Sequence, residues 1–294
     1  MIFPASGVET YLFIPPLVAF VISFFSSMAG LSGAFFILPF QMSVFGFTSP
    51  SVSSTNFLYN VVSIPGGVLR FIREKRMSWP LIFVIVAGTF PGVFAGYFIR
   101  IRYLPDPKAF KLFVGLVLFY IGIRLIRGFR NKRKRADQGD ASMFVISNVS
   151  YSLKRISYDF NGETFSFSVP AMFLLSAIVG IIGGIYGIGG GAIIAPFCVS
   201  VFGLPVYTVA GAALMGTLIT SVAGVFVYSI VPFGDGMAAP PDWSLGALFG
   251  LGGLAGIYLG AKVQRFMPER VIKVILALII FWVSARYIYQ FIAG

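Results

Sequence analysis

The chain has 294 residues, of which 57% are hydrophobic and only 11% carry a charged side chain. Soluble globular proteins carry about 25% charged residues, so this composition excludes an ordinary soluble domain and predicts an integral membrane protein. The sequence contains no histidine, which excludes a histidine metal site and a serine–histidine catalytic triad. Its one cysteine, Cys198, excludes an intrachain disulfide and is expected to be a small buried apolar residue. In a membrane protein a net charge of +12 marks orientation, so we expect no nucleic-acid partner.

Apolar segments follow one another along the chain in two sets, which a polar stretch separates. The first set covers residues 11–29, 34–45, 51–69, 81–99 and 109–126, and the second covers 169–186, 192–202, 206–231, 245–261 and 271–289. A transmembrane helix takes about 20 apolar residues, so the short second segment of each set predicts a short or re-entrant helix. The sequence therefore predicts an all-α polytopic membrane protein of about eight to ten spans, some of them short or broken.

The two sets are copies of each other. The motif GLSGA at residues 30–34 aligns with GIGGG at 187–191, which lies 157 residues later. At the same offset, PFQMSVFG at 39–46 aligns with PFCVSVFG at 196–203, and six of these eight positions are identical. An internal duplication explains both matches.

Basic residues predict how the copies are oriented, because loops rich in Lys and Arg stay in the cytoplasm. If the basic turn at residues 70–76 is cytoplasmic, the dense basic run at 127–135 lies on the same side. The loop equivalent to that turn, residues 232–243, contains two aspartates and no Lys or Arg. Equivalent loops of opposite charge predict an inverted repeat with both termini outside.

Between the copies lies the longest polar stretch of the chain. Its residues 157–167 alternate between polar and apolar around Asn161-Gly162, a pattern that predicts a small β-hairpin. The basic run at 130–135 is interpreted first as a topology anchor and second as a binding site for anionic lipid headgroups. The expected organisation is a first transmembrane repeat at 1–130, a cytoplasmic basic linker with the hairpin at 131–168, and a second transmembrane repeat at 169–294.

None of the ten acidic residues lies inside an apolar segment. Proton pumps and many proton-coupled carriers place Asp, Glu or His within the membrane, and intramembrane proteases need paired aspartates or a His-Glu zinc motif. The sequence therefore predicts neither an enzyme nor a bound cofactor or metal. The polar groups that remain at membrane depth are backbone amides, hydroxyls and side-chain amides.

Glycines interrupt the chain at Gly30 and Gly33 in the first copy, and at Gly187, Gly189, Gly190 and Gly191 in the second. Glycine lets the backbone leave helical geometry, and the next helix then begins with free N–H groups that carry roughly +0.5 of an elementary charge. Two such breaks in inverted repeats would aim two helix starts at one anion. Close helix packing is the alternative reading, and it suits the small-xxx-small pairs Gly92/Gly96, Gly180/Gly184 and Gly252/Gly256/Gly260.

Uncharged polar side chains follow each break. Asn56 and Asn60 share a helix face because they are four residues apart, and Thr217 and Thr220 occupy similar places in the second copy. The alternative role is interhelical hydrogen bonding, worth about 0.6 kcal/mol for each bond. The predicted substrate contacts are Gly30, Ser32, Gly33, Ala34, Asn56, Asn60, Gly187, Gly189, Gly190, Gly191, Thr217 and Thr220, with Gln41 and Tyr59 as weaker candidates. Arg70, Arg124 and Arg286 sit at segment ends, where their side chains can reach the membrane surface.

A duplicated apolar half that opens with a glycine-rich break, together with the hairpin between the halves, resembles the sulfite exporter TauE/SafE family. The most specific part of the resemblance is GIGGGAIIAP at residues 187–196, followed by Gly203. The first copy departs from it, since Ser32 and Ala34 replace two glycines. The resemblance implies transport of sulfur-containing anions such as sulfite, sulfonates or sulfoacetate.

Together these inferences predict a secondary exporter of small oxyanions that works by alternating access in the plasma (cell inner) membrane. An inside-negative potential favours anion exit by about 2.3 kcal/mol per charge per 100 mV, so export of a net negative charge needs no coupling ion. The expected partners are the small anionic substrate and membrane lipid, and a homodimer is left open. The alternatives are an anion channel and a non-transporting membrane scaffold that binds anionic lipid through its basic loop.

Overall fold

The computed structural model describes residues 1–28, 31–73, 77–130, 146–160, 162–232, 238–263 and 269–293. The helices before the linker are α1 (Ile14–Met28), α2 (Ala34–Val44), α3 (Ser51–Ser63), α4 (Pro65–Arg73), α5 (Trp79–Arg102) and α6 (Pro107–Arg130). Those after it are α7 (Val169–Tyr186), α8 (Gly191–Ser200), α9 (Val206–Ile230), α10 (Trp243–Val263) and α11 (Glu269–Ile292). In the described part of the chain, α5, α6, α7, α9, α10 and α11 are long and apolar enough to cross a membrane, whereas α1, α2 and α8 are shorter apolar helices. The predicted multi-pass helical fold is confirmed.

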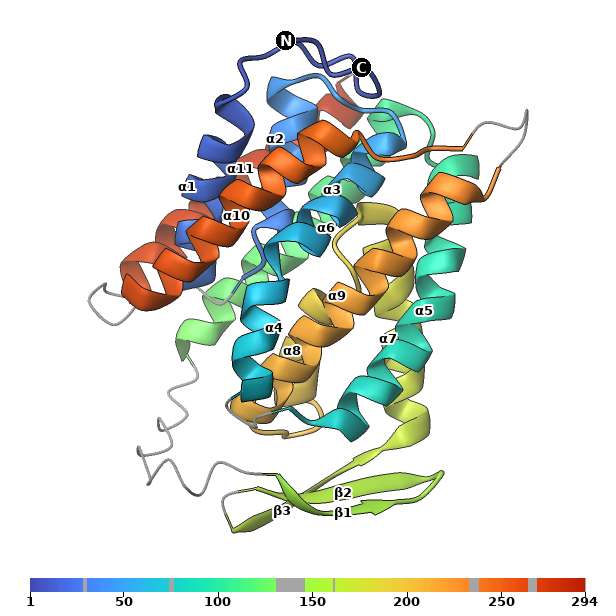
Figure 1. Ribbon diagram of the computed structural model, residues 1–294, viewed down its shortest axis with the longest axis vertical. Coiled ribbons are helices and arrows are strands. Elements are labelled where there is room, and N and C mark those ends of the chain that lie inside the picture. Colours follow the sequence, from blue (N-terminus) through green and yellow to red (C-terminus); the bar gives the residue numbers. More distant parts are fainter. Residues whose placement is uncertain are drawn as a thin grey trace.

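The main contacts between helices each have an equivalent contact between the corresponding helices of the other half. α5 packs against α7 as α10 packs against α1, and α5 packs against α9 as α10 packs against α3. α2 meets α3 as α8 meets α9, and α6 pairs with its own counterpart α11. α1 runs away from the end of the bundle that holds both termini, whereas α7 rises toward that end from the small sheet (Figure 1). The two halves are therefore inverted repeats, as predicted.

Glycine ridges show the same symmetry at the level of single residues. A Cβ atom added to Gly88, Gly92 or Gly96 of α5 would overlap the carbonyl oxygens of Phe173, Ala177 and Ile181 on α7. A Cβ atom added to Gly252, Gly256 or Gly260 of α10 would overlap those of Pro16, Phe20 and Phe24 on α1. The two sets of carbonyls are again 157 residues apart. These glycines bring backbones together, so the packing interpretation is correct for them.

The third segment of the first repeat is broken, although residues 51–69 were expected to form one run. α3 ends at Ser63 and α4 begins at Pro65, so Ile64 lies between the two helices. Proline has no N–H to donate and disfavours helical geometry at the preceding residue, but it suits the first position of a new helix. The counterpart of α3 and α4 in the second repeat is the continuous 25-residue helix α9.

A three-stranded antiparallel sheet precedes the second repeat at the end of the bundle away from the termini (Figure 1). β2 (Arg155–Phe160) pairs with β3 (Glu163–Ser168) as the predicted hairpin, and Gly162 in its turn has φ +77°. The sequence did not predict β1 (Ser147–Tyr151), which pairs with β2. The Tyr158 hydroxyl lies 2.8 Å from the Thr208 hydroxyl and attaches the sheet to the start of α9. Burial raises the pKa of Tyr158 to about 12, so this hydroxyl stays neutral.

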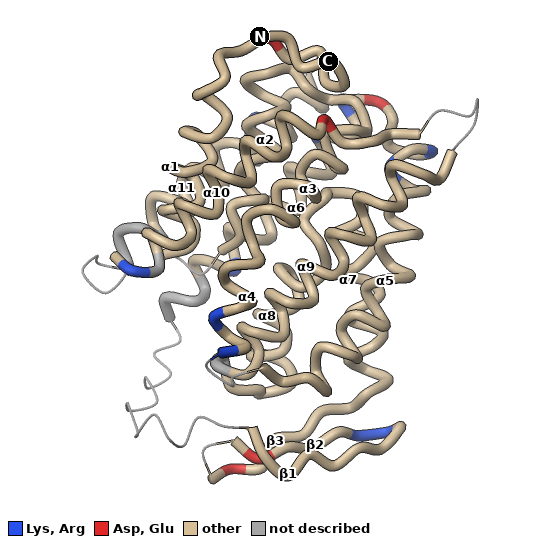
Figure 2. Tube along the Cα trace, in the orientation of Figure 1, with Lys and Arg blue, Asp and Glu red and all other residues tan. Residues whose placement is uncertain are grey.

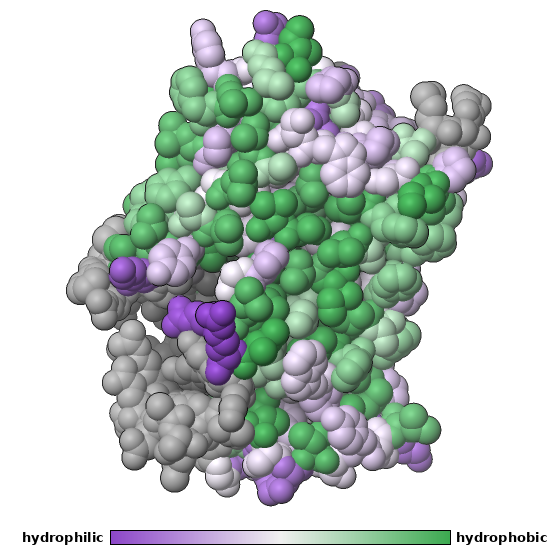
Figure 3. All heavy atoms as spheres, viewed as in Figure 1, coloured by the Kyte–Doolittle hydropathy of each residue, from purple (hydrophilic) through white to green (hydrophobic). Residues whose placement is uncertain are grey.

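The outer surface of the bundle matches a hydrocarbon surrounding. Large apolar side chains are exposed on several helices, among them Leu17, Phe83, Leu174, Phe226 and Leu251. In Figure 3 the visible face of the helices forms a broad hydrophobic band, and Figure 2 shows little charge along the middle of the bundle. The basic run at residues 130–135 was predicted to anchor the topology or bind lipid, and its residues 131–135 lie outside the described residues.

Candidate functional site

The second break separates two helices without a side-chain cap between them. α7 ends at Tyr186, and the chain then turns through Gly187 with φ +84° and Gly189 with φ +72°, a left-handed backbone that favours glycine. No side chain caps α8. In the described part of the chain, the N–H groups of Gly191 and Ala192 donate no hydrogen bond. α8 therefore begins with the free amide donors that the sequence predicted.

The same glycines pack tightly against α3 and α9. A Cβ atom on Gly187 would overlap the Ser53 carbonyl, and one on Gly191 would overlap the Ala213 carbonyl. A Cβ atom on Gly189 would lie 3.0 Å from the hydroxyl oxygen of Thr220. The glycine run therefore serves two needs at once, since it allows the left-handed turns and lets the break enter a narrow space.

The first break contains fewer glycines than the second, since Ser32 and Ala34 stand where the second break has Gly189 and Gly191. α1 ends at Met28 and α2 begins at Ala34, while Gly30 lies outside the described residues. The N–H of Ala34 donates to the Ser32 hydroxyl over 3.3 Å, so Ser32 satisfies one donor at this helix start. A Cβ atom on Gly33 would overlap the hydroxyl of Tyr59, which in turn lies 2.8 Å from the hydroxyl of Ser23. Gly33 thus marks the point where α1, α2 and α3 meet.

Two asparagines of α3 connect the breaks. Asn56 Nδ2 donates to the Ala34 carbonyl at the start of α2, and Asn60 Nδ2 donates to the Ile188 carbonyl inside the second break, both over 3.1 Å. Four residues of helix rise about 6 Å, so the two contacts lie about one turn apart on α3. A further bond joins the repeats directly, since the Tyr186 hydroxyl donates to the Phe35 carbonyl over 2.8 Å. The two breaks therefore belong to one buried hydrogen-bonded cluster.

This cluster keeps unused hydrogen-bonding capacity. Asn56 Oδ1, Asn60 Oδ1 and the Ser221 hydroxyl are buried and have no partner within the described residues. Each asparagine amide nitrogen carries two N–H donors, of which the Ala34 and Ile188 carbonyls each take one. A buried polar group without a partner costs about 1–3 kcal/mol. A polar ligand or water between the breaks would relieve this cost.

The threonines of α9 line the second break, but their hydroxyl protons are already engaged. Thr217 donates to the Ala213 carbonyl over 2.8 Å, and Thr220 donates to the Gly216 carbonyl over 2.6 Å. Each hydroxyl keeps acceptor capacity and lies beside a glycine, Thr217 near Gly191 and Thr220 near Gly189. The two threonines therefore shape the wall of the break, while the free donors come from the backbone.

Gln41 of α2 is fully buried, and neither amide atom has a partner within the described residues. Because an unpaired buried amide costs about 1–3 kcal/mol, Gln41→Leu is expected to raise the free energy of unfolding by about 1 kcal/mol. Thermal unfolding in detergent measures the change, with Gln290→Leu on the partly exposed face of α11 as a control that is expected to leave stability unchanged. A lower melting temperature for Gln41→Leu would show that the amide is paired after all.

Three hydroxyls of the region were not among the candidates. They belong to Ser23 and Tyr186, described above, and to Tyr228, which donates to the Gly184 carbonyl over 2.9 Å. For the two tyrosines, the sequence offered a signal: a tyrosine inside an apolar segment is expected to be buried, and a buried tyrosine hydroxyl needs a hydrogen-bond partner. Which partner it finds depends on the packing of distant helices.

Comparison with known proteins agrees with this architecture. A family model described as "Sulfite exporter TauE/SafE" matches residues 16–287, which include both breaks and both repeats. The chain is 21% identical over 273 residues to "Probable membrane transporter protein YunE" of Bacillus subtilis (strain 168), covering 90% of this chain and 92% of that protein. No solved structure matches the chain. The chain therefore belongs to the sulfite exporter TauE/SafE family of membrane transporters.

Proposed function

We propose that this membrane transporter exports small sulfur-containing oxyanions by alternating access. The observation that carries the proposal is that Asn56 and Asn60, about one turn apart on α3, bond the start of α2 and the break before α8. The family description supports sulfite or a related anion as the substrate. The basic turns and the small sheet would face the cytoplasm, with both termini outside.

The proposed binding chemistry uses dipoles instead of charged side chains. The free N–H groups of Gly191 and Ala192 at the start of α8 would donate to sulfonate or sulfite oxygens, and the helix dipole adds positive potential there. The second N–H of Asn56 and of Asn60 would complete the donor set. Uncharged donors hold an anion without the strong pairing of a buried ion pair, so the anion can also leave.

Alternating access would move the inverted repeats against each other around this fixed point. At the end of the bundle that holds the termini, hydrogen bonds attach the N-terminal segment to the helices. Asp242, only 1% exposed, accepts from the N–H of Ser6 over 3.0 Å and from its hydroxyl over 2.7 Å, and its own N–H donates to the Thr55 hydroxyl over 2.9 Å. These contacts hold the N-terminal segment beside the first turn of α3 and would have to open for the anion to leave.

Flux in proteoliposomes tests the proposal. We expect sulfite and sulfoacetate, offered separately, to be transported, and taurine, which carries no net charge, to be transported far more slowly. Since one charge in a potential of 100 mV is worth about 2.3 kcal/mol, flux is expected to reach an equilibrium concentration ratio of about fiftyfold for each net charge carried at that potential. Flux that ignores the potential would contradict net charge transport, and currents far above carrier turnover would identify a channel. The absence of flux for every sulfur oxyanion would overturn the proposed function.

A further inference from the structure

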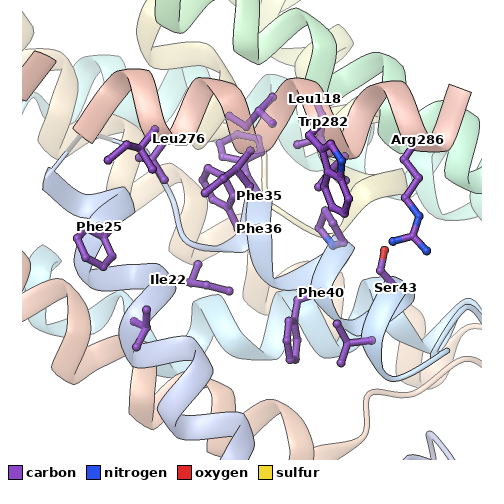
Figure 4. A pocket seen from close by; sticks show the side chains of 17 residues that line it. Ile22, Phe25, Phe35, Phe36, Phe40, Ser43, Leu118, Leu276, Trp282 and Arg286 are labelled. Carbon is purple, nitrogen blue, oxygen red and sulfur yellow. The ribbon is translucent and has the colours of Figure 1, made fainter. Parts of the chain in front are cut away.

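A long groove runs along the outer side of α2, the helix whose Phe35 carbonyl also takes part in the hydrogen-bonded cluster around the breaks. Its walls come from α1, α2 and α11, with one residue of α6, and its volume is about 590 Å³. Figure 4 shows Phe35 and Phe36 of α2 on one side and Leu276 and Trp282 of α11 on the other. We call this space the α11 groove.

The polarity of the α11 groove is confined to one end. Apart from the indole of Trp282, its polar lining residues are Ser43 and Arg286, which lie together at one end, while Phe25 and Leu276 lie at the other (Figure 4). A small oxyanion would lose its hydration in the apolar part without gaining partners. A hydrocarbon chain that carries an anionic group at one end fits this distribution.

The charged end lies at the level of a membrane surface. Trp282 and Tyr289, on either side of Arg286 in the sequence of α11, are 64% and 70% exposed. Exposed Trp and Tyr mark the level of lipid headgroups, where a long cationic side chain can contact a phosphate. From Arg286 to Ile275 the helix rises about 16 Å, which is about half of the 30 Å hydrocarbon core of a bilayer. The groove therefore has the depth of one lipid leaflet.

At the equivalent positions of the other repeat, the described side chains pack against one another. Arg124 and Tyr120 of α6 are the sequence counterparts of Arg286 and Trp282 of α11. The Arg124 guanidinium lies 4.2 Å from the centre of the Phe197 ring of α8, and Tyr120 stacks on the same ring at 6.1 Å. In the first repeat the counterpart of Phe197 is Phe40, which packs instead against Phe45 and Phe249. The Arg286 guanidinium instead lies 5.7 Å from the centre of the Trp282 ring on its own helix and lines the end of the α11 groove, where it can meet a ligand.

We propose that the α11 groove binds one acyl chain of an anionic phospholipid, with the lipid phosphate at Arg286. The lipid would lie against Phe35, Phe36 and Phe40 on the outer side of α2, the helix whose start forms the first break. This proposal does not depend on which anion the protein transports.

Photocrosslinking of the full chain tests the proposal. The protein is reconstituted in phosphatidylcholine vesicles that contain a minor fraction of phosphatidylglycerol with a photoreactive group in its acyl chain. We expect labelling to concentrate on groove residues of α2 and α11 and to be displaced by excess unlabelled phosphatidylglycerol but not by phosphatidylcholine. Arg286→Gln is expected to lower this labelling about tenfold, because a charge-assisted bond to the phosphate is lost.

Two further variants keep the test decisive. Arg124→Gln, the counterpart in the closed repeat, is expected to leave groove labelling unchanged. Ile279→Trp fills the groove without removing the charge, so it is expected to lower labelling even if Arg286→Gln does not fold. Labelling spread evenly over the lipid-facing helices, or unaffected by both groove variants, would overturn the proposal. Crosslinks between α11 helices of two chains would overturn it as well, because a second copy would then cover the groove.

Discussion

Replacing Gly191 with alanine is expected to abolish transport. The added methyl group would overlap the Ala213 carbonyl and lie 2.6 Å from the Thr217 hydroxyl oxygen, both on α9. A backbone carbonyl cannot swing aside, so α8 would have to move away from α9. Overpacking of this kind costs about 1–3 kcal/mol, and the displaced helix start would no longer present its N–H groups beside α3.

Flux and thermal unfolding measured on the same preparation check this expectation. Gly66→Ala is a matched control, because its added methyl group would meet the end of a flexible side chain, Leu254 Cδ1, at 3.2 Å. The control is expected to keep its flux and to gain up to about 1 kcal/mol in stability from the better helix propensity of alanine. Normal flux in Gly191→Ala would show that the close approach of α8 and α9 is not needed for transport.

The double variant Asn56→Ala with Asn60→Ala is expected to lower flux at least about a hundredfold. Each substitution leaves a buried backbone carbonyl, that of Ala34 or Ile188, without its donor, and each loss costs about 1–3 kcal/mol. The variant also removes both side-chain amides from the space between the breaks. We expect each single variant to show an intermediate loss, since one of the two breaks then keeps its asparagine connection to α3.

The matched control for the double variant is Asn148→Ala. Asn148 donates to the exposed Asp159 carboxylate in the small sheet over 2.9 Å, outside the helical bundle. Its replacement is expected to leave flux unchanged. Wild-type flux in the double variant would instead show that the asparagines only join helices and do not contact the transported anion.

The repeats and the two breaks can be predicted from the sequence for a simple reason. The offset of 157 residues that aligns the glycine motifs also separates the carbonyls that α5 and α10 contact, such as those of Ala177 and Phe20. The two copies of the sequence therefore make equivalent helix contacts. The hairpin can be predicted too, because its turn and its alternation are local signals.

Other features depend on contacts that a single sequence does not display. Strand β1 shows little alternation of polar and apolar residues and pairs with β2, so its own sequence does not predict a strand. Thr217 and Thr220 were predicted to contact the substrate, but each hydroxyl donates its proton to a carbonyl four residues earlier in its own helix. Pro65 was a local signal for the helix break at Ile64, but residues 51–69 were predicted as one segment because they are so hydrophobic. Whether the predicted residues contact a substrate remains a prediction.

The unequal third segments make the two halves mechanically different. At the break between α3 and α4, Pro65 has no backbone N–H to donate, so one helical hydrogen bond is missing there. We therefore expect the first repeat to bend at Ile64 at little energetic cost. The second half has an unbroken 25-residue rod at the matching place. The two-fold relation between the halves therefore does not extend to stiffness, and we expect the proposed pathway to open more readily on one side than on the other. In the proposed alternating-access cycle, we therefore expect the conformational steps on the two sides of the membrane to differ in rate.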